Sequence, residues 1–171
     1  MKTIVVGLGN PILSDDGVGW VVVQAAECRY RLLQEAGDPA ATSLPPVDFL
    51  CVALGGLSLM EHLIGYQYAI LVDAIQSSQH PLGACLRFPL EALPDPTAGH
   101  LASTHDTSLL NALQVGRRLG AELPERIEVL AIVAELIYDF SEELSPAVAA
   151  AVPGAVQDVL DLLQTLSLEE V

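Results

Sequence analysis

Short apolar runs alternate along this chain with segments whose apolar residues recur at helical spacing. The apolar runs predict five strands, at residues 4–6, 47–53, 68–72, 82–88 and 127–134. The helical spacing and the capping residues predict helices from residue 18 to near residue 37, and at 57–64, 104–119 and 146–166. This alternation predicts an α/β fold: a single-domain, doubly wound, three-layer sandwich with a mostly parallel five-stranded sheet and helices on both faces.

The predicted fold indicates where a ligand would bind. The run at residues 68–72 is apolar on both faces, which is typical of a central strand. In doubly wound folds, ligands bind outside the carboxyl ends of the strands. Polar residues follow two such ends, at residues 7–19 after the first strand and at Asp73 after the third, and residues 103–106 begin a helix. We therefore expect these three segments to border one crevice.

Within these segments the candidate functional residues are Asp16, Asp73 and His105. Two carboxylates and one imidazole form a mixed oxygen and nitrogen ligand set, which suits nickel or zinc and leaves coordination positions open. Each residue also has a structural interpretation. Asp16 and its neighbour Asp15 could cap the following helix, Asp73 could cap a turn, and His105 could be an ordinary helix-start residue.

The first segment also begins like a dinucleotide-binding loop, with Gly7 and Gly9. The third glycine of that fingerprint is absent, because Ile12 or Leu13 stands in its place. Two aspartates precede the helix and would repel a pyrophosphate. The loop is therefore expected to hold a cation.

The charge balance narrows the possible partners. The chain carries 22 acidic and 7 basic residues, a formal net charge of −15. Nucleic acids and anionic membranes are disfavoured as partners, because both require clustered Lys and Arg. No apolar run reaches the ~18 residues that a membrane span requires, and the N-terminus does not resemble a secretory signal. We expect a soluble, cytoplasmic protein whose partner is a less acidic protein, a metal, or both.

Other common catalytic groups are not indicated. Cys28, Cys51 and Cys85 lie far apart in apolar segments, which predicts reduced core cysteines. No H-E-x-x-H zinc protease motif and no G-x-S-x-G nucleophile elbow occurs. The remaining histidines lie in a predicted helix or in loops without carboxylates that could complete a metal site, so we assign them no function: His62, His80 and His100.

The loop sequence VGLGNPILSDDGVG at residues 6–19 closely resembles the opening motif of the nickel–iron hydrogenase maturation endopeptidases. The resemblance continues through LVDA at residues 71–74, His105 and LSP at residues 144–146. It covers nearly the whole chain in the same order. It therefore implies one maturation-protease-like domain over residues 1–171.

Members of that family remove a short C-terminal extension from the hydrogenase large subunit once nickel has been inserted. Their metal-contacting residues fall on Asp16, Asp73 and His105, which the resemblance thus implies to be both metal-binding and catalytic. The implied partner is a nickel-loaded large-subunit precursor, which carries the nickel, and the enzyme is expected to be a monomer. Nickel could polarise the scissile carbonyl or a water, or it could position the strand while a carboxylate acts as general base.

Two alternatives stay open at this point. The sequence GLGNP at residues 7–11 also resembles the first strand and loop of peptidyl-tRNA hydrolases, although the Tyr and the His-Asn pair expected after it are missing and the charge opposes tRNA. A non-enzymatic nickel-binding maturation factor could use the same three ligands. A cleavage assay would distinguish that factor from a protease.

Overall fold

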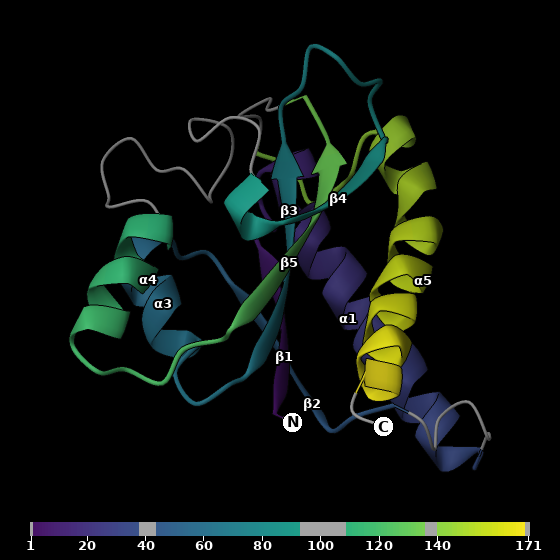
Figure 1. The fold of residues 1–171 in the computed structure, drawn as a ribbon. Helices are drawn as coiled ribbons and strands as arrows, with labels where there is room; N and C mark the ends of the chain where they lie inside the picture. The colour runs from purple at the N-terminus through teal and green to yellow at the C-terminus, as the bar shows by residue number, and fades with distance from the viewer. Residues whose placement is uncertain (1, 38–43, 93–108, 136–139, 170–171) are drawn as a thin grey trace.

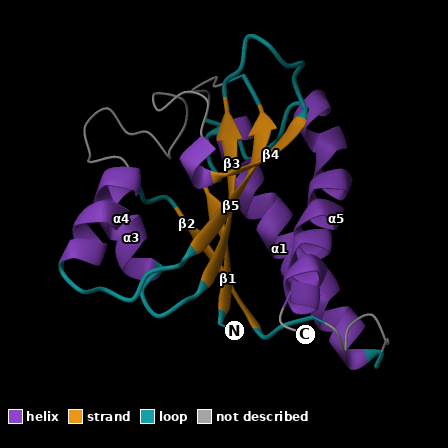
Figure 2. Ribbon diagram, in the orientation of Figure 1, coloured by secondary structure: helices purple, strands orange, loops and turns teal. Residues whose placement is uncertain are grey.

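The computed structural model describes residues 2–37, 44–92, 109–135 and 140–169, which form a sheet with helices packed against it (Figures 1 and 2). The strands are β1 (Thr3–Leu8), β2 (Val47–Val52), β3 (Tyr68–Ile75), β4 (Cys85–Pro89) and β5 (Arg126–Val133). The α-helices are α1 (Val18–Glu35), α3 (Gly56–His62), α4 (Leu109–Arg118) and α5 (Pro146–Glu169). Two short 3-10 helices are η1 (Ser14–Gly17) and η2 (Leu90–Ala92). All five predicted strands are confirmed.

The sheet has the order β2-β1-β3-β5-β4 and is mixed rather than purely parallel. β1 pairs in parallel with β2 and β3, and β3 pairs in parallel with β5, whereas β4 is antiparallel to β5. The direction of β4 follows from its connection to β3. Residues 76–84 contain no helix and return the chain from the end of the sheet at which β3 finishes. A parallel return would need a longer crossover, usually through a helix.

Two hydrophobic clusters lie on opposite faces of the sheet. On one face, side chains such as Val5, Ile70 and Leu130 pack with buried residues of α1 and α5. On the other face, neighbouring strand residues pack with α3 and α4. Figure 1 shows α1 and α5 on one side of the sheet and α3 and α4 on the other. Every residue of β3 is buried, which confirms the prediction that it is central.

Some predicted boundaries were wrong. β3 does not end before Asp73 but continues to Ile75, because apolar residues there keep pairing with β5; Asp73 itself lies opposite Ala131. The helix predicted from residue 104 is described from Leu109 onward, and its predicted cap at residues 103–104 lies outside the described residues.

Helix α5 is long and apolar enough, by length and composition alone, to cross a membrane. Its side chains Val148, Val159 and Leu163 are buried in the cluster shared with the sheet and α1. A core helix of a soluble protein passes the same test, so this property is weak evidence for a membrane span.

Candidate active site

The connections of the sheet define a topological switch point between β1 and β3. From β1 the chain crosses through α1 to β2 on one side, whereas from β3 it proceeds to β4 on the other side. A crevice at the carboxyl ends of the strands is expected where the direction of the connections reverses. Asp16 lies in η1, the first element after β1, and Asp73 lies near the carboxyl end of β3. Both predicted carboxylates therefore border the switch point, and η1 contacts β3.

The start of α1 packs directly on the backbone of the two central strands. A Cβ atom added to Gly19 would lie 2.4 Å from the carbonyl oxygens of both Leu8 and Val72. A Cβ atom on Gly7 would lie 2.5 Å from the carbonyl oxygen of Gly19. Glycine at these positions thus permits close packing of the α1 backbone on the backbones of β1 and β3. Because Val72 precedes Asp73, this packing brings the beginning of α1 next to the candidate carboxylate of β3.

The Asp16 side chain turns back over the loop that carries it. Its Oδ2 accepts a hydrogen bond of 2.7 Å from the Asn10 backbone N–H, and the residue is 9% exposed. Gly9 has a φ of +113°, and a Cβ there would come within 1.8 Å of the Asp16 carbonyl oxygen. The helix α1 begins after Gly17, and no side chain caps its N-terminus. The interpretation of Asp15 and Asp16 as caps of this helix is therefore wrong.

Asp73 is fully buried in the middle of an apolar element. Its Oδ1 accepts a hydrogen bond of 2.9 Å from the backbone N–H of Ala74. Because the residue lies inside β3, it does not cap a turn, and that alternative is wrong. A buried carboxylate is costly in an apolar strand unless it interacts with polar or charged groups. The place of Asp73 in β3 therefore depends on the polar interactions around it.

The third predicted residue, His105, lies outside the described residues. Among the residues that the structure does describe, no group of three or more His, Cys, Asp or Glu side chains could hold a metal. The described part of the predicted site is thus the carboxylate pair.

Asp15 points to a different part of the molecule from Asp16. Its carboxylate accepts hydrogen bonds from the backbone N–H of Ser145 (2.6 Å) and from the Ser145 hydroxyl (2.8 Å). Asp15 is 3% exposed. It therefore anchors the start of α5 rather than that of α1. Sequence reasoning missed this role because the two residues are far apart along the chain and no local spacing connects them.

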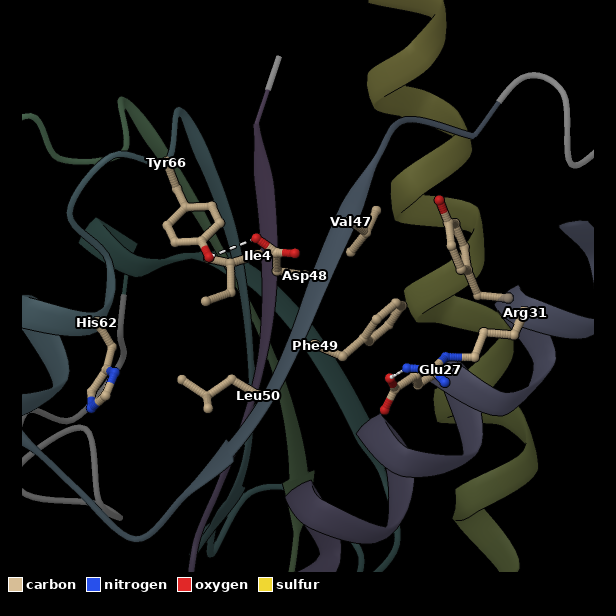
Figure 3. Close-up of a pocket in the computed structure, with 10 residues that line it drawn as sticks. Ile4, Glu27, Arg31, Val47, Asp48, Phe49, Leu50, His62 and Tyr66 are labelled. Atoms are coloured by element: carbon tan, nitrogen blue, oxygen red, sulfur yellow. Dashed lines mark hydrogen bonds and ion pairs between the residues drawn. The ribbon is translucent and has the colours of Figure 1, made fainter.

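A cavity of about 470 Å³ lies away from these carboxylates, along the amino-terminal half of β2 (Figure 3). The Tyr66 hydroxyl donates to the Asp48 carboxylate across 2.8 Å there, and Arg31 is paired with Glu27. This hydrogen bond and this ion pair occupy four of its polar side chains, and neither Asp16 nor Asp73 lines it. A smaller cavity of about 150 Å³ adjoins η1 and is lined by residues that include Trp20.

Two of the three cysteines, Cys51 and Cys85, are poor nucleophiles. Burial, with a further contribution from the charge of Glu27, raises the pKa of the Cys51 thiol to about 11. Burial also raises the pKa of Cys85, and the nearby charge of Asp158 acts in the same direction. Both thiols are therefore neutral near pH 7. All three cysteines are free, but Cys28 is exposed on α1, so the prediction that it lies in the core was wrong.

Comparison with known proteins matches the chain to one family. A family model described as HycI, hydrogenase maturation protease, matches residues 43–162. The hydrogenase 2 maturation protease of Escherichia coli K12 is 26% identical over all of this chain and 96% of its own length. The hydrogenase expression/formation protein HoxM of Cupriavidus necator is 24% identical, over 94% of this chain and 73% of its own.

Solved structures agree on the fold. The hydrogenase maturating endopeptidase HybD of E. coli superposes with a TM-score of 0.69 at 24% identity, covering 96% of this chain and 93% of HybD. A hydrogenase 2 maturation peptidase from Thaumarchaeota archaeon SCGC_AB-539-E09 gives a TM-score of 0.59 at 27% identity, covering 95% and 98%. These matches support neither a peptidyl-tRNA hydrolase nor a non-enzymatic nickel-binding factor. The chain belongs to the hydrogenase maturation protease family, and its activity is the endopeptidase processing of a hydrogenase precursor.

Proposed function

We propose that this endopeptidase removes a C-terminal extension from the large-subunit precursor of a nickel–iron hydrogenase after nickel has been inserted. The observation that carries the proposal is the pair of acidic side chains, Asp16 and Asp73, at the switch point between β1 and β3. Two low-exposure carboxylates at one sheet edge favour a cation there, since a cation offsets the cost of burying like charges.

In this proposal Asp16, Asp73 and His105 together contact the nickel that the precursor carries. Carboxylate oxygens and an imidazole nitrogen suit borderline divalent ions, and three protein ligands leave positions for groups of the precursor itself. The nickel is then part of the substrate rather than a resident cofactor. Without a precursor the enzyme should bind free nickel weakly.

Two routes to peptide cleavage are compatible with these residues. In the first, the precursor's nickel polarises the scissile carbonyl or a water. In the second, nickel fixes the precursor strand in place and one carboxylate accepts a proton from the attacking water. In both routes the Asn10 backbone N–H orients Asp16.

The charge of the chain bears on how the precursor is recognised. A net charge of −15 favours approach by a less acidic or locally basic surface, with an association rate that falls as salt rises. We assign the reaction to the cytoplasm and to a monomeric enzyme.

The decisive experiment compares nickel-loaded with nickel-free precursor, using one enzyme preparation and reading cleavage on a gel and the new C-terminus by mass spectrometry. We expect only the nickel-loaded precursor to be cleaved. Asp16→Asn should abolish cleavage, whereas Glu61→Gln, on the exposed end of α3, should leave it unchanged.

Two results would contradict the nickel requirement as stated. Equal cleavage of both precursors would show that the enzyme does not depend on nickel in the substrate. Loss of activity after the enzyme alone is treated with a chelator and washed would instead indicate a permanently bound metal.

A further inference from the structure

The segment at residues 141–145, between β5 and α5, is hydrogen-bonded to the loop that follows β1. The Ser141 N–H donates to the Ile12 carbonyl over 3.0 Å, and the Ser14 N–H donates back to the Ser141 carbonyl over 2.7 Å. The Ser14 hydroxyl donates to the Glu143 carbonyl over 2.9 Å. These bonds join parts of the chain that are about 130 residues apart, so the candidate-site loop is not held by its own sequence alone.

The strongest connection between the two segments is made by Asp15. Both of its carboxylate oxygens accept from Ser145, one from the backbone N–H and one from the hydroxyl. Ser145 directly precedes Pro146, the first residue of α5, so the negative charge lies at the positive end of the helix dipole. Hydrogen bonds to a charged acceptor are stronger than neutral ones. This pair is nearly excluded from solvent on the Asp15 side.

The backbone beside Asp15 is held in an unfavourable conformation. Among the described residues, Ser14 is the one non-glycine residue with a positive φ, at 51°. Such a conformation persists when surrounding contacts impose it, and such positions cluster at functional sites. Here the imposing contacts are those of Ser14 with Ser141 and Glu143.

Asp15 and Asp16 are adjacent on the same short 3-10 turn but bond in different directions. Asp15 binds Ser145, whereas Asp16 accepts from the N–H of Asn10. Because η1 has only four residues, fixing one of these side chains restricts the other. We propose that Asp15 and Ser145 form a clasp that positions Asp16 for the cleavage reaction. Asp15 is then a positioning residue, and its effect on catalysis rests on the proposed function.

The test uses three variants of the full-length enzyme. Asp15→Ala removes both bonds of the clasp, and Ser145→Ala removes only the hydroxyl bond. Asp15→Asn keeps the shape and an acceptor for the Ser145 N–H. Asp161→Ala is the matched control, since it removes an exposed hydrogen bond with Gln157 elsewhere on α5.

Two readouts are measured well below the unfolding transition. The first is kcat and KM for nickel-loaded precursor; the second is the NMR signal and hydrogen exchange of the Asn10 amide, which reports the position of Asp16 in the substrate-free enzyme. We expect Asp15→Ala to lower kcat about tenfold or more with little change in KM, because small displacements of a reacting group cost large factors in rate. The Asn10 amide should shift and lose protection. Asp15→Asn should keep both kcat and the Asn10 amide signal near the wild-type values. Ser145→Ala should give values between those of the wild type and of Asp15→Ala.

A role confined to stability would give a different pattern. If Asp15→Ala and Ser145→Ala lower the thermal midpoint while kcat and the Asn10 amide match those of Asp161→Ala, the clasp does not position Asp16 and the proposal is wrong. If Asp15→Ala does not fold, Ser145→Ala and Asp15→Asn test the proposal instead. The proposal is then wrong if kcat and the Asn10 amide of Ser145→Ala match those of Asp161→Ala. If the wild type cleaves no precursor but the Asn10 amide still responds to loss of the clasp, the proposed function fails and the positioning of Asp16 stands.

Discussion

Replacing Gly19 by alanine tests whether α1 must rest directly on the central strands. The added Cβ would lie 2.4 Å from two carbonyl oxygens, those of Leu8 and Val72, where real Cβ atoms essentially never come closer than 3.0 Å. The helix would have to retreat by at least the difference, 3.0 − 2.4 = 0.6 Å. The strands cannot yield easily, because Leu8 pairs with β2 and Val72 pairs with both β1 and β5.

The size of the effect follows from two opposing contributions. Overpacking costs about 1–3 kcal/mol, and the upper part of this range is expected because both clashing partners are backbone atoms. Alanine recovers up to about 1 kcal/mol through its greater helix propensity. The net loss is about 2 kcal/mol, which for a domain of this size lowers the thermal midpoint by about 4–8 °C.

The matched control is the same substitution at Gly154 in α5, where an added Cβ meets nothing within 4 Å. Only the propensity gain of about 1 kcal/mol applies there, so the midpoint should rise by about 2–4 °C. Thermal unfolding followed by circular dichroism, with urea unfolding as a check, measures both variants. Shifts of the same sign and similar size would refute the close-packing argument.

In the cleavage assay, Gly19→Ala and Gly154→Ala distinguish an effect on the position of Asp16 from an effect on the stability of the fold. If α1 retreats from the strands, η1 and Asp16 move with it, away from Asp73. Below the unfolding transition, Gly19→Ala should therefore cleave precursor far more slowly than the wild type, by up to about 10²-fold for a displacement near 1 Å. Gly154→Ala should cleave at the wild-type rate.

Further predictions concern Asp73 and the cysteines. Asp73→Asn should abolish cleavage while the thermal midpoint holds or rises, because the fold then buries fewer like charges near Asp15 and Asp16; a midpoint lower than that of Gly19→Ala would show that Asp73 is structural. At pH 8, iodoacetamide should modify exposed Cys28 well before Cys51, whose pKa of about 11 leaves only ~0.1% of it as thiolate. The Cys51 rate should climb as pH rises toward 11; equal rates for the two thiols at pH 8 in folded enzyme, read by peptide mass spectrometry, would contradict the burial of Cys51.

The sequence predicted those features that local patterns determine. Apolar periodicity located β1, β3 and α1, and the strand-end rule selected Asp16 and Asp73 without reference to any structure. The direction of β4 was missed, because it depends on a connection too short for a crossover rather than on the composition of the strand. β3 is longer than predicted, because an aspartate after an apolar run suggests the end of a strand, whereas β5 continues to pair with β3 beyond Asp73.

Contacts between distant parts of the chain were beyond local patterns. The sequence suggests Asp15 as a cap of the helix that follows it, but its partner Ser145 lies far along the sequence, at the start of a different helix. The missing third glycine and the two aspartates oppose a dinucleotide fingerprint but do not indicate what the glycines of the loop do instead. Their actual role, close packing of α1 on two strands, requires knowing that β3 lies beside β1.

The position of β5 between β3 and β4 constrains how the chain can fold while it is being synthesised. β3 and β4 leave the ribosome before β5. They are not neighbours in the native sheet, because residues 126–133 of β5 lie between them. Until those residues appear, the edge of β3 and the whole of β4 present unpaired backbone groups that invite pairing with other chains. Chains that end before β5 should therefore aggregate rather than form a smaller working enzyme.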